Sequence, residues 1–257
     1  MTDRNDTTFF VGYLRCPRQL VPFVFTIIFA FILAAVGLGY ALAASQTDPG
    51  NGSIRFDFGR QTVQGVLELT PAPILHVTEG SEQIAAGETI MLAGQGKNGA
   101  VERAAMLEGQ LVTAAGVLLE RGELDMLQLV GGRNGLRAAD DQSLITDIPT
   151  PEPLGRWLIT GEICDGKCTS GAMRPGRGIA HRACANLCIL GGVPAVFVTE
   201  EPLAGENFLL VTGEGEEVIP PELLDYVGIF VALEGDVVRH GDLLALTVDT
   251  TTVEVLE

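Results

Sequence analysis

One uninterrupted apolar segment constrains this chain more than any other feature of its sequence. No charged residue occurs between Gln19 and Thr47, and positions 20–44 read LVPFVFTIIFAFILAAVGLGYALAA. A helix of about 25 residues is roughly 37 Å long at about 1.5 Å per residue, which exceeds a hydrocarbon core of about 30 Å. The segment therefore predicts a single transmembrane helix.

The charges on either side of this segment predict its direction. Arg4, Arg15 and Arg18 precede it, whereas no basic residue follows it before Arg55. The positive-inside rule then leaves residues 1–19 in the cytoplasm and the rest of the chain, after the segment, outside it.

A cleaved signal peptide is the alternative to a retained anchor. Ala41-Leu42-Ala43 is a small-x-small cleavage pattern, but the apolar run is longer than the roughly 7 to 15 residues of a signal-peptide core. We expect a retained anchor at residues 20–44, surrounded by the lipids of the cytoplasmic membrane. The main domain would then be periplasmic or otherwise extracytoplasmic.

The region after the apolar segment contains an internal repeat of one β unit. Residues 109–130, GQLVTAAGVLLERGELDMLQLV, align with residues 228–249, GIFVALEGDVVRHGDLLALTVD, without a gap. Each copy has alternating apolar residues on both sides of a turn, at Gly122 or Gly241, and this pattern predicts a β-hairpin. The expected fold is mainly β, with two small antiparallel OB-like barrels.

The repeat also sets the expected domain boundaries. The first β unit would cover residues 53–132 and the second residues 155–252. Between them, residues 133–154 contain three prolines and are typical of a semi-extended linker. The second copy holds about 25 additional residues, which we treat as an insertion at residues 164–191.

The charge of the chain excludes one class of partner. It has 33 acidic and 16 basic residues, a net charge of −17, and one Trp. An OB-like unit that binds nucleic acid needs a basic groove with aromatic side chains, so no nucleic-acid partner is expected. An acidic surface suits basic partners such as soluble electron carriers, which it would attract over long distances.

No motif in the sequence predicts an enzyme. GxSxG, HExxH and P-loop patterns do not occur. His76 lies in the alternating stretch ILHVTE and is expected to be half exposed, and His240 lies at a turn where the other copy has Arg121. Neither histidine is expected to be catalytic.

Four of the five cysteines fall in the insertion, as two CxxxC pairs. We expect an extracytoplasmic insertion of this size to be stapled by disulfides. We expect a turn or short helix bearing Cys164 and Cys168 to fold back against a helix bearing Cys184 and Cys188. Antiparallel packing of the two would favour the bridges Cys164–Cys188 and Cys168–Cys184.

Two other interpretations of the same residues remain open. His181, Cys184 and Cys188 would share one helical face, so with Cys164 and Cys168 they could bind zinc, copper or an iron–sulfur cluster. The alternative is a redox-active thiol pair, although the CxxC spacing of thioredoxin-like proteins is absent.

The insertion is also basic, unlike the rest of the chain. A glycine-rich loop that leads into a helix N-terminus could bind an anion. The alternative is that these bases pair with acidic groups of the same protein. The four candidates are Lys167, Arg174, Arg177 and Arg182.

The block GEICDGKC…GAMRPG…AHRACANLCILGGVPAVFV, within residues 155–250, resembles one in uncharacterised bacterial membrane-anchored proteins. The resemblance supplies no activity for this chain. From the residues alone we expect a non-enzymatic binding or scaffold protein, an accessory subunit that contacts the other subunits of a membrane redox complex. A metal- or redox-handling accessory protein is the alternative.

Overall fold

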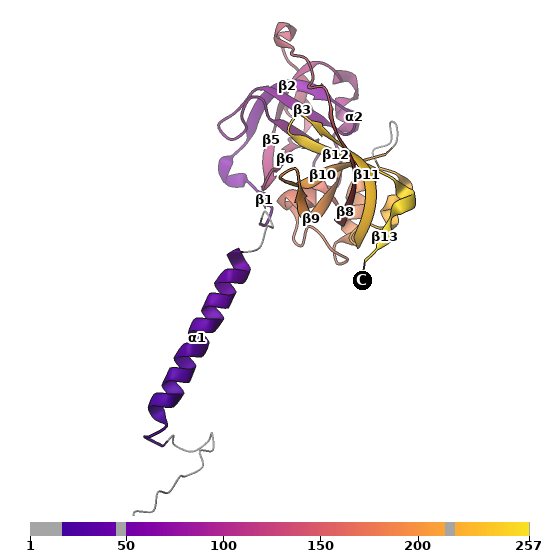
Figure 1. The fold of residues 1–257 in the computed structure, drawn as a ribbon. Coiled ribbons are helices and arrows are strands. Elements are labelled where there is room, and N and C mark those ends of the chain that lie inside the picture. The colour runs from indigo at the N-terminus through magenta and orange to yellow at the C-terminus, as the bar shows by residue number, and fades with distance from the viewer. Residues whose placement is uncertain (1–16, 45–49, 214–218, 257) are drawn as a thin grey trace, which may run out of the picture. The chain divides into compact units, whose positions relative to one another are not determined.

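The computed structural model describes residues 17–44, 50–213 and 219–256. The chain divides into two compact units, Met1–Thr47 and Asp48–Glu257. Most of the expected cytoplasmic segment 1–19 lies outside the described residues. The first unit contributes one helix, and the second carries all of the described β structure (Figure 1).

Helix α1 (Val21–Ala44) is built from aliphatic, aromatic and small residues. Thr26 donates a hydrogen bond of 2.9 Å from its hydroxyl to the Pro22 carbonyl oxygen. Such an internal partner matters in hydrocarbon, where no water can satisfy a polar group. By length and composition α1 can cross a membrane, either as a retained anchor or as a signal sequence.

Five strands close the first barrel: β2 (Gln61–Glu68), β3 (Ile74–Glu79), β4 (Thr89–Ala93), β5 (Leu111–Arg121) and β6 (Leu124–Leu129). β2, β3 and β4 form a meander, and β5 returns antiparallel to β2. β6 pairs antiparallel with β5 and parallel with β4. This is the strand order of the OB-fold.

The second barrel repeats the first with β8 (Glu152–Asp165), β9 (Ala195–Leu203), β10 (Glu206–Thr212), β11 (Phe230–His240) and β12 (Leu243–Val248). β8, β9 and β10 form the meander, β11 pairs with β8, and β12 pairs parallel with β10 and antiparallel with β11. The prediction of a mainly β fold with two OB-like barrels is confirmed.

Short elements surround the two barrels. Among the described residues, the other strands are β1 (Ser53–Ile54), β7 (Leu136–Ala138) and β13 (Glu254–Val255), and the other α-helices are α2 (Val101–Ala104) and α3 (Arg182–Leu190), with several single helical turns between elements. α3 lies in the insertion between β8 and β9, at the position of the loop that joins the first two strands of an OB barrel. The insertion therefore extends one end of the second barrel.

The repeat seen in the sequence corresponds to equal positions in the two barrels. Gly116 and Gly235 occupy the same register in the β5–β6 and β11–β12 hairpins. A Cβ atom would lie 2.3 Å from the Gln128 carbonyl oxygen at Gly116, and 2.5 Å from the Thr247 carbonyl oxygen at Gly235. Both glycines are therefore needed where two strands approach closely.

The two barrels share a hydrophobic core, so they form one body. Side chains from β3, β4 and β6 of the first barrel pack against β9, β10 and β12 of the second. Burial of this apolar surface stabilises the pair of barrels. The residues include Ile74, Met91, Met126, Val196, Phe208 and Leu210.

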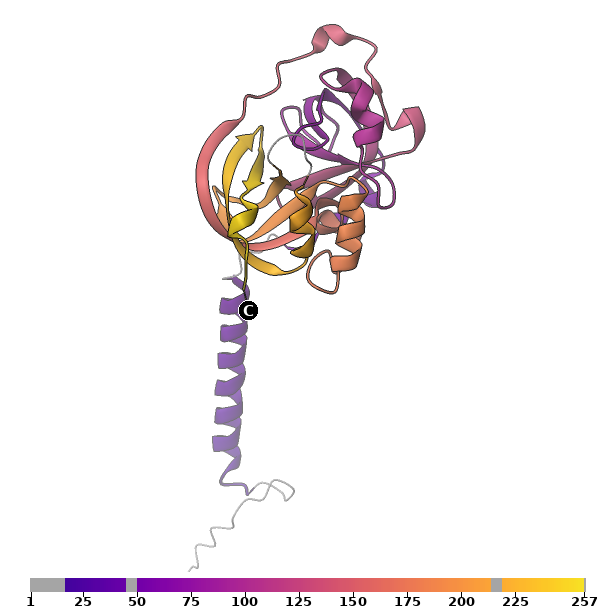
Figure 2. The same ribbon diagram turned by 90° about the vertical axis from the view of Figure 1, so that its right-hand side faces the viewer.

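The connection between the barrels is shorter than the predicted linker 133–154. β7 pairs with β5 and so belongs to the first barrel. β8 begins at Glu152, where Pro153 pairs with Val238 of β11. The remaining connection, residues 139–151, arches from the first barrel to the second (Figure 2).

Candidate metal centre

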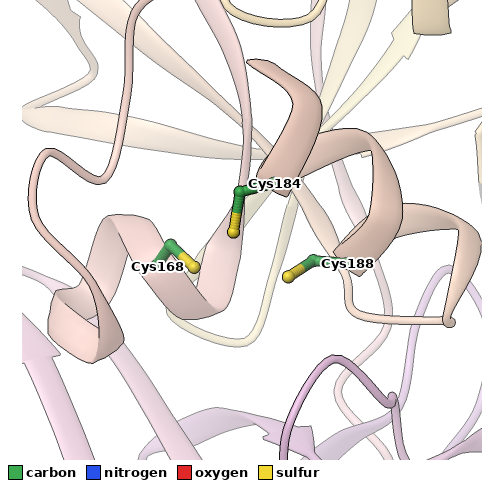
Figure 3. Close-up of side chains that lie close together, drawn as sticks. All are labelled: Cys168, Cys184 and Cys188. Carbon is green, nitrogen blue, oxygen red and sulfur yellow. The ribbon is translucent and has the colours of Figure 1, made fainter. Parts of the chain in front are cut away.

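Three cysteine thiols meet in the insertion. Cys168 begins a single helical turn, Cys168–Ala172, whereas Cys184 and Cys188 lie one turn apart on α3 and therefore on the same face. The sulfurs of Cys168, Cys184 and Cys188 all lie within 4.8 Å of one another. In Figure 3 the three side chains point toward a common space between the helical turn and the helix.

The spacing of these sulfurs suits one soft metal ion. Thiolates bound to an ion at about 2.3 Å lie roughly 3.8–4.0 Å from one another, so small side-chain movements would close the site. Met173 adds a thioether, because its Sδ lies 3.6 Å from Cys184 Sγ. Thiolate and thioether donors favour Cu(I) and Zn²⁺ over hard cations.

A lysine from the first barrel lies against the thiols. Lys97 Nζ lies 2.7 Å from Cys184 Sγ and 3.8 Å from Cys188 Sγ. The hydrogen bond with Cys184 raises the pKa of Lys97, so its ammonium stays charged. A fixed positive charge here compensates for the charge that three thiolates would accumulate.

A hydrogen bond between the thiols of Cys168 and Cys188 shifts their pKa values in opposite directions. The hydrogen bond from the Cys168 thiol to Cys188 raises the pKa of Cys168, and burial raises it further. The same bond is the main reason that the pKa of Cys188 is lowered, and Lys97 lowers it too. Cys188 is therefore the first of the two to offer a thiolate to a metal.

Asp165 and His181 hold the turn that carries Cys168. Asp165 Oδ1 accepts a hydrogen bond of 2.8 Å from the Cys168 backbone amide, and Asp165 Oδ2 lies 3.0 Å from His181 Nε2. Both side chains are buried. His181 was expected beside Cys184 and Cys188, but it precedes α3 and pairs with Asp165 next to Cys168.

Cys164 lies apart from the other three cysteines, and this corrects the disulfide prediction. Its thiol donates a hydrogen bond of 3.1 Å to Glu162 Oε1, and its side chain belongs to the core shared by the barrels. The expected bridges Cys164–Cys188 and Cys168–Cys184 are not formed, because all four thiols are free. Burial and the Glu162 carboxylate raise the pKa of Cys164 well above its ordinary value.

The physical reason is the length of β8. The prediction placed Cys164 on a turn or short helix, but the strand continues through Asp165. Successive side chains of a strand point to opposite faces, so Cys164 enters the core while Asp165 faces the insertion.

Lys167 has a structural contact at this site. Its side chain is 2% exposed, and its ammonium donates to the carbonyl oxygens of Gly94 and Gly96 at 2.6 and 2.8 Å. Burial lowers its pKa. These two bonds hold the loop of the first barrel that presents Lys97.

The three arginine candidates lie at the edge of the insertion. Arg182 donates to the Asp225 carbonyl oxygen at 2.7 Å, and Arg174 donates to the Gly52 carbonyl oxygen at 3.3 Å. Arg174 and Arg177 line a small cavity of about 140 Å³ that reaches Cys168.

The sequence predicted the cysteines of this site but not its other members. Lys97 lies in the stretch MLAGQGK, about ninety positions before α3, and nothing in that stretch marks it as a partner of thiols. Met173 and Asp165 were likewise not singled out. Only the packing of the first barrel against the insertion brings Lys97 to the sulfurs.

No protein-family model matches this chain, and no curated protein or solved structure matches it either. Its function therefore has to be inferred from the site.

Proposed function

We propose that this chain is a membrane-anchored protein whose double barrel binds one soft metal ion through Cys168, Cys184 and Cys188. The observation that carries the proposal is the meeting of three free thiols on two short helical elements. Of the two hypotheses that the sequence left open, this observation favours a metal-handling protein over a scaffold protein whose insertion is held by disulfides. Binding of the ion, rather than catalysis, is the role we assign to the site.

Copper(I) fits this donor set best. The site offers three thiols and a nearby thioether, all soft donors, and Lys97 supplies a positive charge that limits the net charge of a copper–thiolate complex. Zn²⁺ also accepts thiolates but more often has four protein ligands. An iron–sulfur cluster ordinarily has four cysteine ligands, one more than meet in this site.

The same geometry argues against a simple disulfide redox pair. A dithiol couple uses two sulfurs, whereas three meet in this site, and Lys97 bonds to the third of them, Cys184. The proposed physiological role is to hold a metal ion at the membrane as an accessory subunit of a membrane redox complex, with its acidic surface facing basic partners.

Metal titration of the full chain in mild detergent tests this function. Under anaerobic reducing conditions we expect one Cu(I) per chain, measured by competition with a coloured chelator. Bound metal should protect Cys168, Cys184 and Cys188 from alkylation, as read by peptide mass spectrometry. Retention of full alkylation at these three positions in the presence of excess Cu(I) or Zn²⁺ would contradict the proposal.

The orientation of the anchor is a second part of the proposal. The asymmetry of the flanking arginines supports a cytoplasmic N-terminus and an exported double barrel. Alkaline phosphatase fused after Glu257 should be active, and a fluorescent protein that matures only in the cytoplasm should be dark. The chain should also stay in the membrane pellet after an alkaline wash. Release by the wash would indicate a cleaved signal sequence, and a bright cytoplasmic reporter would refute the orientation.

A further inference from the structure

Two histidines from different barrels meet one carboxylate, away from the thiols. Glu68 ends β2 and His76 lies on β3, whereas His240 ends β11 of the second barrel. Glu68 Oε2 lies 2.8 Å from His76 Nε2 and 2.5 Å from His240 Nε2. The centroids of the two imidazole rings are 5.3 Å apart.

This cluster is buried, contrary to the expectation for His76. His76 is 6% exposed and His240 is 5% exposed, and Glu68 is partly buried. Burial alone would raise the pKa of Glu68, but the hydrogen bonds from His240 and His76 outweigh it and lower the pKa to about 2. The cluster therefore places one carboxylate oxygen between two imidazole rings.

A second layer of contacts orients the His76 ring. His76 Nδ1 lies 3.2 Å from Thr89 Oγ1, and the Thr89 amide donates a hydrogen bond of 2.8 Å to Asp242 Oδ1. Histidines that bind metals usually have such a partner on the nitrogen that faces away from the ion. With Nε2 on an ion, Nδ1–H would donate to Thr89.

The donor atoms have the composition and spacing of a transition-metal site. Two imidazole nitrogens and one carboxylate oxygen suit Zn²⁺ and its neighbours in the first transition row. Ligand atoms about 2.0–2.1 Å from a tetrahedral ion lie roughly 3.3 Å apart, so the contacts of Glu68 would lengthen by less than about 1 Å. One face of the cluster adjoins a cavity of about 410 Å³, lined by Glu68, His240, Thr70, Thr212 and Thr247 among others.

We propose that Glu68, His76 and His240 bind one divalent transition-metal ion, Zn²⁺ by preference, which links the two barrels. The ion would have three protein ligands and one position open to the cavity, where water or a small anion completes its coordination. The donors are nitrogen and oxygen instead of sulfur, so this site is independent of the thiol centre and does not rest on its function.

Cobalt(II) is the probe that separates the two sites. The full chain carrying Cys168→Ser, Cys184→Ser and Cys188→Ser is titrated with Co²⁺ in detergent. We expect one Co²⁺ per chain, with visible d–d bands and without thiolate-to-cobalt charge-transfer bands. Zn²⁺ at about one hundred times its Kd should raise the melting temperature by about 5–10 °C, because it binds the folded state only.

Variants in the same background identify the ligands. His240→Gln and Glu68→Gln are each expected to weaken Co²⁺ binding more than about 100-fold. Glu68→Gln nearly preserves the shape of the side chain and keeps one oxygen that can accept from both histidines, but it removes the negative charge. It therefore keeps the test valid even if His240→Gln folds poorly. His181→Gln is the matched control, because His181 is the only other histidine in the chain and it pairs with Asp165.

Three outcomes would overturn the proposal. The first is that the triple-serine chain is folded but binds neither Co²⁺ nor Zn²⁺. The cluster would then only connect the two barrels by hydrogen bonds. The second is Co²⁺ binding that survives both His240→Gln and Glu68→Gln. The third is an equal loss of binding in His181→Gln. None of these results bears on the thiol centre, because its cysteines are absent from every protein in the test.

Discussion

Replacing Cys168, Cys184 or Cys188 singly by serine is expected to weaken Cu(I) binding roughly 100- to 1,000-fold. A thiolate site with four ligands is worth about 10–16 kcal/mol of apparent binding free energy, so each ligand accounts for about 3 kcal/mol. Serine keeps the size and hydrogen bonding of the side chain but offers no soft donor. Competition titration against a Cu(I) chelator measures the change.

Cys164→Ala is the matched control for these variants. Cys164 lies in the same insertion and in a CxxxC pair with Cys168, but its thiol faces Glu162 and the shared core. The affinity for Cu(I) should stay within about threefold of that of the parent, since no ligand is lost. If Cys164→Ala lost as much affinity as Cys168→Ser, or if all three serine variants bound normally, the assignment of the three ligands would be wrong.

Replacing Gly99 by alanine is expected to lower the free energy of unfolding by about 3 kcal/mol. A Cβ atom there would lie 1.7 Å from the Gly192 carbonyl oxygen, and the Gly99 amide donates a hydrogen bond of 2.8 Å to the Gly191 carbonyl oxygen. Backbone atoms cannot turn aside as a flexible side chain can, so the loop bearing Lys97 must separate from the end of α3. The melting temperature should fall by about 6–12 °C.

Gly131→Ala controls for the loss of a glycine in the same region. Gly99 and Gly131 line one cavity of about 590 Å³, but a Cβ atom at Gly131 would meet nothing within 4 Å, and its φ of −65° suits any residue. The free energy of unfolding of the Gly131→Ala chain should differ from that of the parent by less than about 0.5 kcal/mol. Thermal unfolding followed by circular dichroism distinguishes the Gly99→Ala chain from the Gly131→Ala chain. A Gly99→Ala chain that melts with the parent would show that the barrel loop and α3 are not in this close contact.

Much of the fold could be predicted because its signals are local. The apolar run that forms α1 is continuous in the sequence, and the alternation around Gly122 and Gly241 marks each hairpin within about twenty residues. Because the two hairpin sequences align, the prediction of an OB-like barrel for one β unit applied to the other as well. The end of the linker was missed because β8 begins within its proline-rich part, at Glu152.

The candidate sites could be predicted only in part. Spacing along the chain was enough to place Cys184 and Cys188 on one helical face, since a helix fixes the positions i and i+4. Spacing could not show that Cys164 lies apart from the other three cysteines. Its position depends on where β8 ends and on which face of that strand packs into the core.

By itself the sequence determined the apolar helix, the doubled β unit and the cysteine-rich insertion, since each follows from the regular geometry of helices and strands over a short stretch of chain. Only the tertiary structure decided which groups meet. Lys97 reaches Cys184 across the two barrels, and His240 reaches Glu68 in the same way. The reason is physical: the shared core brings together residues more than eighty positions apart, and no local pattern encodes that packing.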